Sequence, residues 1–283
     1  MEIIAILLTC FNRIQKTDEC LNSLFRVLDN VENYKFDIYL VDDNSKDGTA
    51  ALIKEKYPII QIINGTGSLF WAGGMRLAWR TALKSKKDYS GFLLINDDVS
   101  FIPTFWDNII QTNKFSNNNF GKNGIYVSST KDKNMGQFTY GGDRYKNKLF
   151  KHVFYQVYPS DIPQECSIAN ANILYVTKDV VNEIGILDSH FTHSLADFDY
   201  TLTAHEKGIP VLVCPEFGGY CVNDHQSKST AKSLKERISN LYDIKGLALN
   251  EYLYYLKKHF WWKVPYAFVV HWIQAIFPNI KYS

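Results

Sequence analysis

Residues 1–100 alternate between short, continuous apolar runs and longer segments in which apolar residues recur every three or four positions. The continuous runs predict strands buried on both faces, and the recurring spacing predicts helices that pack on one side. The alternation is typical of parallel βαβ units, so we expect a doubly wound α/β sheet. The predicted strands are 3–10, 36–43, 59–65 and 91–98, and the predicted helices are 16–31, 45–57 and 72–87.

The pattern is less regular after residue 102. The Asn-rich segment 113–124 predicts a polar loop, and the short alternating stretches within 128–158 predict antiparallel strands or a flap. Regular structure then returns, and the tail 229–283 is helical in pattern. Between residue 158 and the tail, we expect strands at 173–177 and 210–215, a short helix at 179–185 and a longer helix at 196–208.

Each predicted strand of the first half is followed by polar residues. The carboxyl ends of parallel strands meet at one edge of a sheet, where ligands bind. Turn preference accounts for one Asn or Asp cluster at a strand end, but it does not explain acid pairs at two of them. We therefore expect a ligand site at this edge. The residues concerned are Thr9, Arg13, Asp42, Asp43, Asn64, Asn96, Asp97 and Asp98.

Composition and charge narrow the class of protein. A hydrophobic content of 46% suits a globular fold, and a net charge of +2 gives no argument for nucleic acid as a partner. The five cysteines form no C-x-x-C pair, so we expect free thiols in a reducing cytoplasm. The N-terminal apolar run predicts a first strand and not a signal peptide. No apolar run reaches the ~18 residues of a membrane-spanning helix.

Two motifs are absent from the sequence, and their absence disfavours two classes of enzyme. The chain has no G-x-G-x-x-G and no P-loop, which disfavours hydride transfer on a dinucleotide and P-loop phosphate chemistry. A second acid pair, Asp197 and Asp199, lies in the first turn of the predicted helix 196–208. Two interpretations stay open for this pair, because acids at this position complement the helix dipole and also supply a base or metal ligand.

Five motifs together resemble a known family. They are "LLTCFNR" (7–13), "VDDNSKDGT" (41–49), "GTGSLFWAGGMRLAW" (65–79), "LLINDDV" (93–99) and "ADFDYTLTAHEKG" (196–208). In order and spacing they resemble the inverting nucleotide-sugar glycosyltransferases of family 2, such as the rhamnosyltransferases of bacterial polysaccharide synthesis. The resemblance implies a GT-A fold, with a Rossmann-like mixed sheet and helices on both faces. It also implies a catalytic domain at 1–228, with nucleotide-binding (1–100) and acceptor-binding (101–228) halves, before a helical extension at 229–283.

The resemblance implies a UDP- or dTDP-sugar donor and a glycan or lipid-linked acceptor. Asp42 or Asp43 would accept the N3–H of the uracil or thymine ring. Arg13 would pair with a phosphate, and Trp71 would form a wall of the sugar site. Arg76, where many relatives carry Asn, is a further candidate phosphate contact. The remaining implied donor-binding residues are Thr9, Asn64, Gly74, Asn96 and Asp97.

The resemblance also implies a metal and a base. Asn96 and Asp98 stand at the ends of the family's D-x-D motif, and Asp98 would ligate Mn²⁺ or Mg²⁺ that bridges the donor diphosphate. His225 would be a third ligand, while Asn96 in place of Asp lowers the charge of the site. Asp197 matches the general base that deprotonates the acceptor hydroxyl, so that the anomeric configuration inverts. Ala196 replaces the Glu that often precedes this base.

Two other functions stay open. A nucleotidyltransferase that makes a sugar nucleotide would need a Gly-rich basic loop after the first strand, and residues 9–19 contain no glycine. A non-catalytic, glycosyltransferase-like binding protein is compatible with Asn96 and Ala196.

The tail has an interfacial composition, with Trp261, Trp262, Lys257, Lys258 and Lys263 close together. This composition favours peripheral contact with the inner face of the plasma membrane, where a lipid-linked acceptor would lie. The alternative is that the tail helices pack on the catalytic domain or at a homodimer interface.

Overall fold

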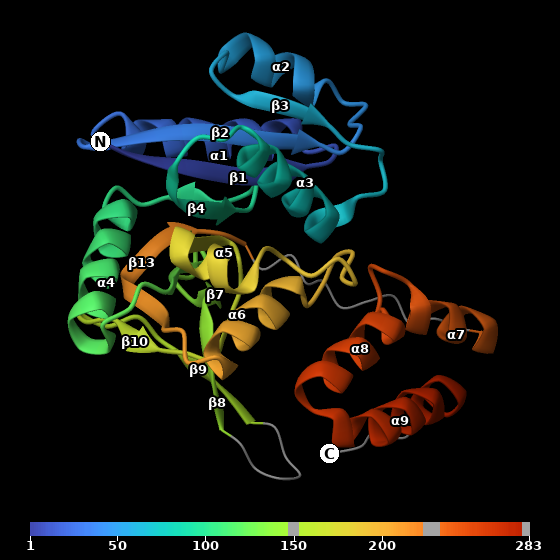
Figure 1. Ribbon diagram of the computed structural model, residues 1–283. Helices are drawn as coiled ribbons and strands as arrows, with labels where there is room; N and C mark the ends of the chain where they lie inside the picture. Colours follow the sequence, from blue (N-terminus) through green and yellow to red (C-terminus); the bar gives the residue numbers. More distant parts are fainter. Residues whose placement is uncertain (147–152, 223–232, 279–283) are drawn as a thin grey trace.

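A large mixed sheet forms the centre of the protein, which a computed structural model describes at residues 1–146, 153–222 and 233–278 (Figure 1). The ten-stranded sheet has the order β10-β13-β6-β12-β4-β1-β2-β3, with β5 and β7 paired to β13 and β6. Its strands are β1 (Glu2–Cys10), β2 (Tyr34–Asp42), β3 (Gln61–Asn64), β4 (Tyr89–Ile95), β5 (Ser100–Phe101), β6 (Ile125–Lys131), β7 (Phe138–Tyr140), β10 (Gln164–Glu165), β12 (Ile173–Thr177) and β13 (Val211–Tyr220). A second sheet has the order β11-β8-β9, with β8 (Gly142–Lys146), β9 (Val153–Val157) and β11 (Ile168–Ala169).

The first half of the large sheet is parallel, as predicted, and the second half is not. β1 pairs in parallel with both β2 and β4, and β2 pairs in parallel with β3. β12 runs antiparallel to β4 and to β6, which makes the sheet mixed. The carboxyl ends of β1, β2, β3 and β4 therefore share one edge, which is where the polar residues follow the strands.

Helices cover both faces of the sheet. They are α1 (Ile14–Leu28), α2 (Thr49–Lys56), α3 (Phe70–Lys84), α4 (Phe105–Phe120), α5 (Lys178–Ile184) and α6 (Ala196–Glu206). Alternate residues of β1 enter opposite apolar layers: Ile4 and Ile6 pack with α1 and α4, and Ala5 and Leu7 pack with α3 and α6. This two-sided burial explains why β1 is apolar at each position from Ile3 to Leu8 instead of at every second one.

The prediction of a loop at 113–124 is wrong, because α4 continues through most of this segment and ends at Phe120. The buried stripe of α4 starts with apolar Phe105 and Ile109 and continues with Thr112 and Ser116, all fully buried. The two hydroxyl groups donate to the carbonyl oxygens of Asn108 (2.7 Å) and Lys122 (2.7 Å). Because the buried positions change from apolar to hydrogen-bonded polar side chains, the sequence of this segment shows no hydrophobic periodicity that would predict a helix.

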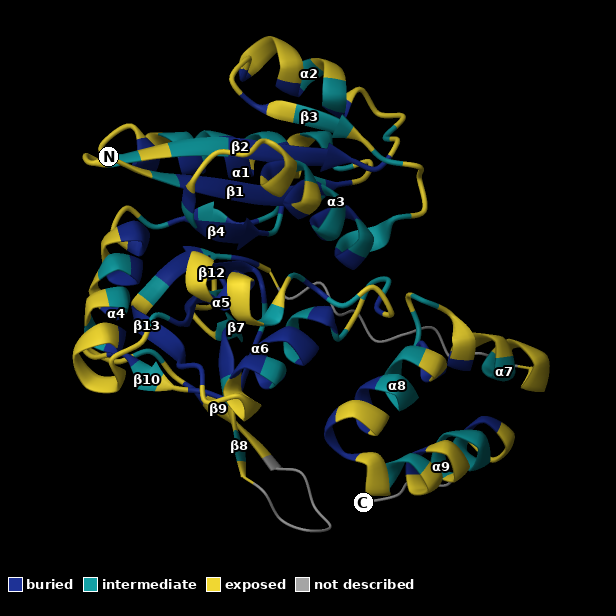
Figure 2. Ribbon diagram, in the orientation of Figure 1, coloured by how far each residue is buried: buried dark blue, intermediate teal, exposed yellow. Residues whose placement is uncertain are grey.

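The C-terminal extension is helical, as predicted, and consists of α7 (Leu234–Tyr242), α8 (Leu249–His259), a 3₁₀ turn η1 (Trp261–Lys263) and α9 (Val264–Ile276). Tyr255 and Leu256 of α8 are buried and belong to the same apolar layer as α3 and α6. α9 and its flanks instead show much exposed apolar surface, coloured yellow in Figure 2. None of the helices in the described ranges is long and apolar enough to cross a membrane.

Candidate active site

A cavity of about 650 Å³ opens at the carboxyl edge of β1, β2 and β4. Its volume lies within the range of small-molecule sites, about 300–1,000 Å³. Six of the residues singled out from the sequence line it together, although they come from four separate segments of the chain. These are Thr9, Arg13, Asp43, Trp71, Asn96 and Asp97.

Asp43 organises one wall of this cavity. Its carboxylate accepts from the backbone N–H groups of Gly67 (2.7 Å), Leu69 (2.8 Å) and Phe70 (3.2 Å), and so fixes the loop that leads into α3. Asp42 is 4% exposed and accepts from the backbone N–H of Ser45 (2.9 Å). Both acids of the "VDD" motif therefore shape the loops around the site.

Three of the predicted donor-binding residues, Asp42, Asn64 and Gly74, do not line the cavity. Asn64, at the end of β3, is exposed. Gly74 is buried in α3, where a Cβ atom would approach Thr9 Oγ1 to 2.2 Å. The glycine allows α3 to pack closely on the end of β1, and this packing positions Thr9.

The acid pair after β4 is bridged by one guanidinium group. Arg13 donates to Asp97 Oδ1 (2.9 Å) and to Asp98 Oδ2 (2.7 Å), and Thr17 Oγ1 donates to Asp97 Oδ2 (3.2 Å). Burial raises the pKa of Asp97 to about 6, although the Arg13 charge acts to lower it. The side chain of Asp98 is 14% exposed, and of the two carboxylates it is the one that reaches solvent more readily.

Asp98, the predicted cation ligand, contacts Arg13 through Oδ2 (2.7 Å). A carboxylate that shares an ion with phosphate oxygens is a common arrangement for Mg²⁺. The Asn96 side-chain oxygen accepts from Trp71 Nε1 (2.8 Å), so one of its lone pairs is already used. Within the described ranges, no three His, Cys, Asp or Glu side chains are grouped to hold a metal ion. His225 lies outside the described residues.

Asp197 lies in the first turn of α6. Its Oδ2 accepts from the backbone N–H of Ala171 (3.1 Å), and the next residue, Asn172, accepts the backbone N–H of Asn96 (3.1 Å). The pair 171–172 thus links Asp197 to the end of β4. Burial raises the pKa of the Asp197 carboxyl to about 6, against the opposing effect of its backbone N–H contacts.

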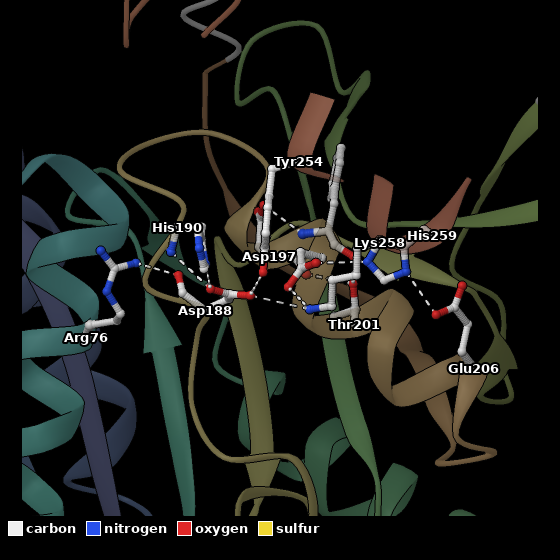
Figure 3. A network of polar contacts seen from close by, with 11 residues as sticks. Arg76, Asp188, His190, Asp197, Thr201, Glu206, Tyr254, Lys258 and His259 are labelled. Carbon is white, nitrogen blue, oxygen red and sulfur yellow. Dashed lines mark hydrogen bonds and ion pairs between the residues drawn. The ribbon is translucent and has the colours of Figure 1, made fainter. Parts of the chain in front are cut away.

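Asp199 has different contacts from Asp197. Figure 3 shows Lys258 and His259 of α8 near Asp197 and Thr201 of α6. Asp199 is 1% exposed, and its two oxygens contact Lys258 Nζ (2.8 Å) and His259 Nε2 (2.8 Å) of α8. His259 also contacts Glu206 through Nδ1 (2.9 Å). Asp199 therefore attaches the C-terminal extension to α6.

The loop before α6 is held from two sides. Arg76 donates to the carbonyl oxygens of Asp188 (2.9 Å) and Phe191 (2.6 Å), so its guanidinium supports this loop. From the other side, Tyr254 donates to Asp188 Oδ2 (2.9 Å), and Glu251 accepts the backbone N–H of Thr192 (3.0 Å). These contacts position the segment that ends at the predicted base.

Seven further residues line the cavity and were not among the predicted site residues: Cys10, Phe11, Gly67, Phe70, His193, Asp243 and Lys245. Phe70 precedes Trp71 in a motif that the sequence did mark. His193 lies four residues before Asp197, in the loop that leads into α6. Asp243 and Lys245 belong to the C-terminal extension, and no local pattern connects them with residues near position 10 or 97.

Residues 5–161, more than half of the chain, match the family model described as Glycosyl transferase family 2. The chain belongs to this family, and it is a glycosyltransferase. A search of curated proteins finds no match.

Two solved structures share the fold. The mannosyltransferase PcManGT from Pyrobaculum calidifontis, in complex with GDP-Man and Mn²⁺, has a TM-score of 0.52 at 11% identity, covering 98% of this chain and 76% of that one. TarS 1–349 of S. aureus has a TM-score of 0.52 at 13% identity, covering 98% of this chain and 81% of that one. Identities this low show the fold alone, and they confirm the expected GT-A architecture.

Proposed function

We propose that this glycosyltransferase moves a sugar, with inversion, from a UDP- or dTDP-sugar to a glycan or lipid-linked acceptor in bacterial surface polysaccharide synthesis. The observation that carries the proposal is the cavity at the carboxyl edge of the sheet. It combines a nucleotide-sized space with Arg13, whose guanidinium contacts Asp98, and with Asn96, whose backbone is linked through residues 171–172 to Asp197. Membership of the family supports the donor class.

The donor would lie along the strand ends. The nucleoside would occupy the end near Thr9 and Asp43, where the loop fixed by Asp43 forms the wall. The sugar would lie toward Trp71, whose indole is fixed by Asn96. The diphosphate would then fall between them, near Arg13 and the acid pair.

Asp98 would hold a divalent cation, Mn²⁺ or Mg²⁺, together with the donor's phosphate oxygens. When bound, such an ion supplies positive charge to the departing diphosphate. The Mn²⁺ in the structure of the similar mannosyltransferase supports this choice of cofactor. Arg13 would balance the charge of Asp97 beside it.

Asp197 would act as the general base. With a pKa of about 6 its carboxylate is ionised at neutral pH, and it is basic enough to take a proton from a hydroxyl as that oxygen reacts. The acceptor oxygen forms a bond to the anomeric carbon while the bond to the diphosphate oxygen breaks on the opposite face. The proton passes to Asp197, and the nucleoside diphosphate leaves.

The test is a panel of UDP- and dTDP-sugars incubated with the protein and Mn²⁺. Release of the nucleoside diphosphate, with inverted anomeric configuration in the product by NMR, is the expected result. Synthesis of a sugar nucleotide from a nucleoside triphosphate and a sugar 1-phosphate would instead identify a nucleotidyltransferase. Nucleotide binding without turnover of any donor would identify a non-catalytic binding protein.

A further inference from the structure

The C-terminal extension forms part of the donor cavity. Asp243 and Lys245 lie in the turn between α7 and α8, and both line the cavity together with Arg13 and Phe70. The family match ends at residue 161, so this part of the wall lies outside the matched region.

The turn that carries Lys245 is built rigidly. The backbone N–H of Lys245 donates to Asp243 Oδ1 (2.9 Å), and the N–H groups of Gly246 (2.8 Å) and Ala248 (3.1 Å) donate to the Asp243 carbonyl oxygen. At Gly246 a Cβ atom would come within 2.4 Å of the Asn240 carbonyl oxygen, so the backbone passes too closely for a side chain. The position of Lys245 is therefore set by the turn.

The turn is anchored to the catalytic core by the helix that follows it. α8 contacts α6 through the buried Asp199, which bonds to both Lys258 (2.8 Å) and His259 (2.8 Å). The same helix bonds to the loop before α6 through Glu251, which accepts the backbone N–H of Thr192 (3.0 Å). Because α8 begins four residues after Lys245, this docking keeps Lys245 at the cavity.

The charge of Lys245 is available to a ligand. The side chain is exposed, and its Nζ lies 5.9 Å from the centre of the Phe70 ring, which lines the same cavity. No carboxylate of the described ranges lies within ion-pair distance of it. The other cation of the wall, Arg13, already bridges Asp97 and Asp98.

We propose that Lys245 binds the diphosphate of the donor, so that the C-terminal extension completes the donor site. This inference rests on the proposed function, because it takes the ligand to be a nucleoside diphosphate sugar. A diphosphate needs more positive charge than an arginine engaged with two acids supplies, and an ammonium group is a common phosphate ligand. As the glycosidic bond breaks, the same contact would stabilise the charge that develops on the leaving oxygen.

The test compares Lys245→Gln and Lys245→Arg with Lys257→Gln as the matched control. Lys257 is also an exposed lysine, lies on α8 and does not line the cavity. Each protein is titrated calorimetrically with UDP, dTDP and uridine at one fixed Mg²⁺ concentration. A hydrogen bond to a charged group corresponds to roughly ten- to hundred-fold in affinity, which is the loss expected for UDP or dTDP in Lys245→Gln. Uridine binding, Lys257→Gln and the melting temperature should stay at wild-type values, and Lys245→Arg should retain most of the affinity.

The outcomes separate this inference from the proposed function. A wild-type protein that binds neither UDP nor dTDP overturns the proposed function and the inference with it. If the wild type binds UDP and Lys245→Gln binds it equally well, the proposed function stands and the inference is wrong. Equal losses for UDP and uridine, or an Arg variant as weak as the Gln variant, would also overturn it, because neither result depends on a charge at the diphosphate.

Discussion

Asp197 and Asp199 lie two residues apart in one helical turn and have different surroundings. The carboxylate of Asp199 is paired with a lysine and a histidine of α8. The Asp197 carboxylate accepts from the backbone N–H groups of Ala171 and Phe198, and burial raises its pKa to about 6. A carboxylate with such a pKa suits a base, so the two acids should respond differently to the same substitution.

Asp197→Asn should lower the transfer rate by roughly two to four powers of ten, the usual contribution of a positioned base. Donor affinity should stay near the wild-type value, because the nucleotide is held at other strand ends. Steady-state turnover and calorimetric titration with UDP or dTDP measure the two effects. Asp199→Asn is the control, and it should lower the melting temperature because it weakens the attachment of α8. More than about a tenth of wild-type turnover in Asp197→Asn would contradict the assignment of the base.

The pH dependence of turnover gives a second test of Asp197. Its pKa in the folded protein is raised to about 6, so the carboxyl is protonated and inactive below that pH and ionised above it. Turnover at saturating donor should therefore fall as the pH is lowered through about 6. The residual activity of Asp197→Asn should lack this limb. A wild-type limb near the ordinary Asp value of ~3.9 would show that the base is a different, unperturbed group.

Removal of the metal tests Asp98. We expect excess EDTA to abolish transfer, and Mn²⁺ or Mg²⁺ to restore it, because the charge on the leaving diphosphate needs a counter-charge. Asp98→Ala should abolish transfer and leave the circular dichroism spectrum unchanged. Full activity of the wild type in excess EDTA would rule out the metal requirement.

At the scale of elements, polar contacts attach α8 to α6. His259 is buried between Asp199 and Glu206 and lies beside Lys258 and Tyr255. Burial lowers the pKa of His259, but its hydrogen bonds to the two carboxylates outweigh burial and raise the pKa above its ordinary value. The His259 imidazole, which links two acids, therefore keeps its proton to a higher pH in the folded protein than in the unfolded chain.

This attachment should weaken at alkaline pH. A histidine whose pKa is raised by folding stabilises the protein fully below its unfolded pKa of ~6.5, and this contribution is lost as the pH rises through the folded value. The melting temperature of the wild type should thus exceed that of His259→Gln most clearly near pH 6 and by less near pH 9. His205→Gln, an exposed histidine on α6, should show no such dependence. A difference that grows with pH would contradict the charged state.

At the scale of the whole molecule, the C-terminal extension has two faces. α8 joins the apolar core and brings Lys245 to the cavity, which corresponds to the packing alternative for the tail. The exposed apolar side chains lie in η1, in α9 and just beyond it, and they correspond to the membrane alternative. They are Trp261, Trp262, Tyr266, Phe268, Val269, Ile276 and Phe277.

We expect this second face to bind a lipid surface peripherally. Trp261 is 70% exposed, so Trp261→Ser should reduce co-sedimentation with vesicles of anionic phosphatidylglycerol without changing the melting temperature. Ile59→Ser is the control, because Ile59 is 67% exposed and lies before β3, in a different part of the molecule. A dimer in solution that Trp261→Ser dissociates, with no vesicle binding, would show that the face is a homodimer interface instead.

The sequence by itself determined what depends on local order. Continuous apolar runs such as Ile3–Cys10 indicate buried strands, because a strand covered on both faces cannot be polar on either. The acids at 42–43 and 97–98 indicated the site, because parallel strands bring their carboxyl ends to one edge. The family motifs could also be recognised in the sequence, because each is short and contiguous.

Only the tertiary structure decided the features that depend on contacts between distant residues. The helix α4 was missed because Thr112 and Ser116 are buried with satisfied hydroxyl groups, which no hydrophobic period reveals. Asp199 was distinguished from Asp197 by Lys258, 59 residues further along the chain. Lys245 reaches the cavity because α8 docks on α6, and such docking depends on side-chain shape and charge across an interface, which the local spacing of residues does not encode.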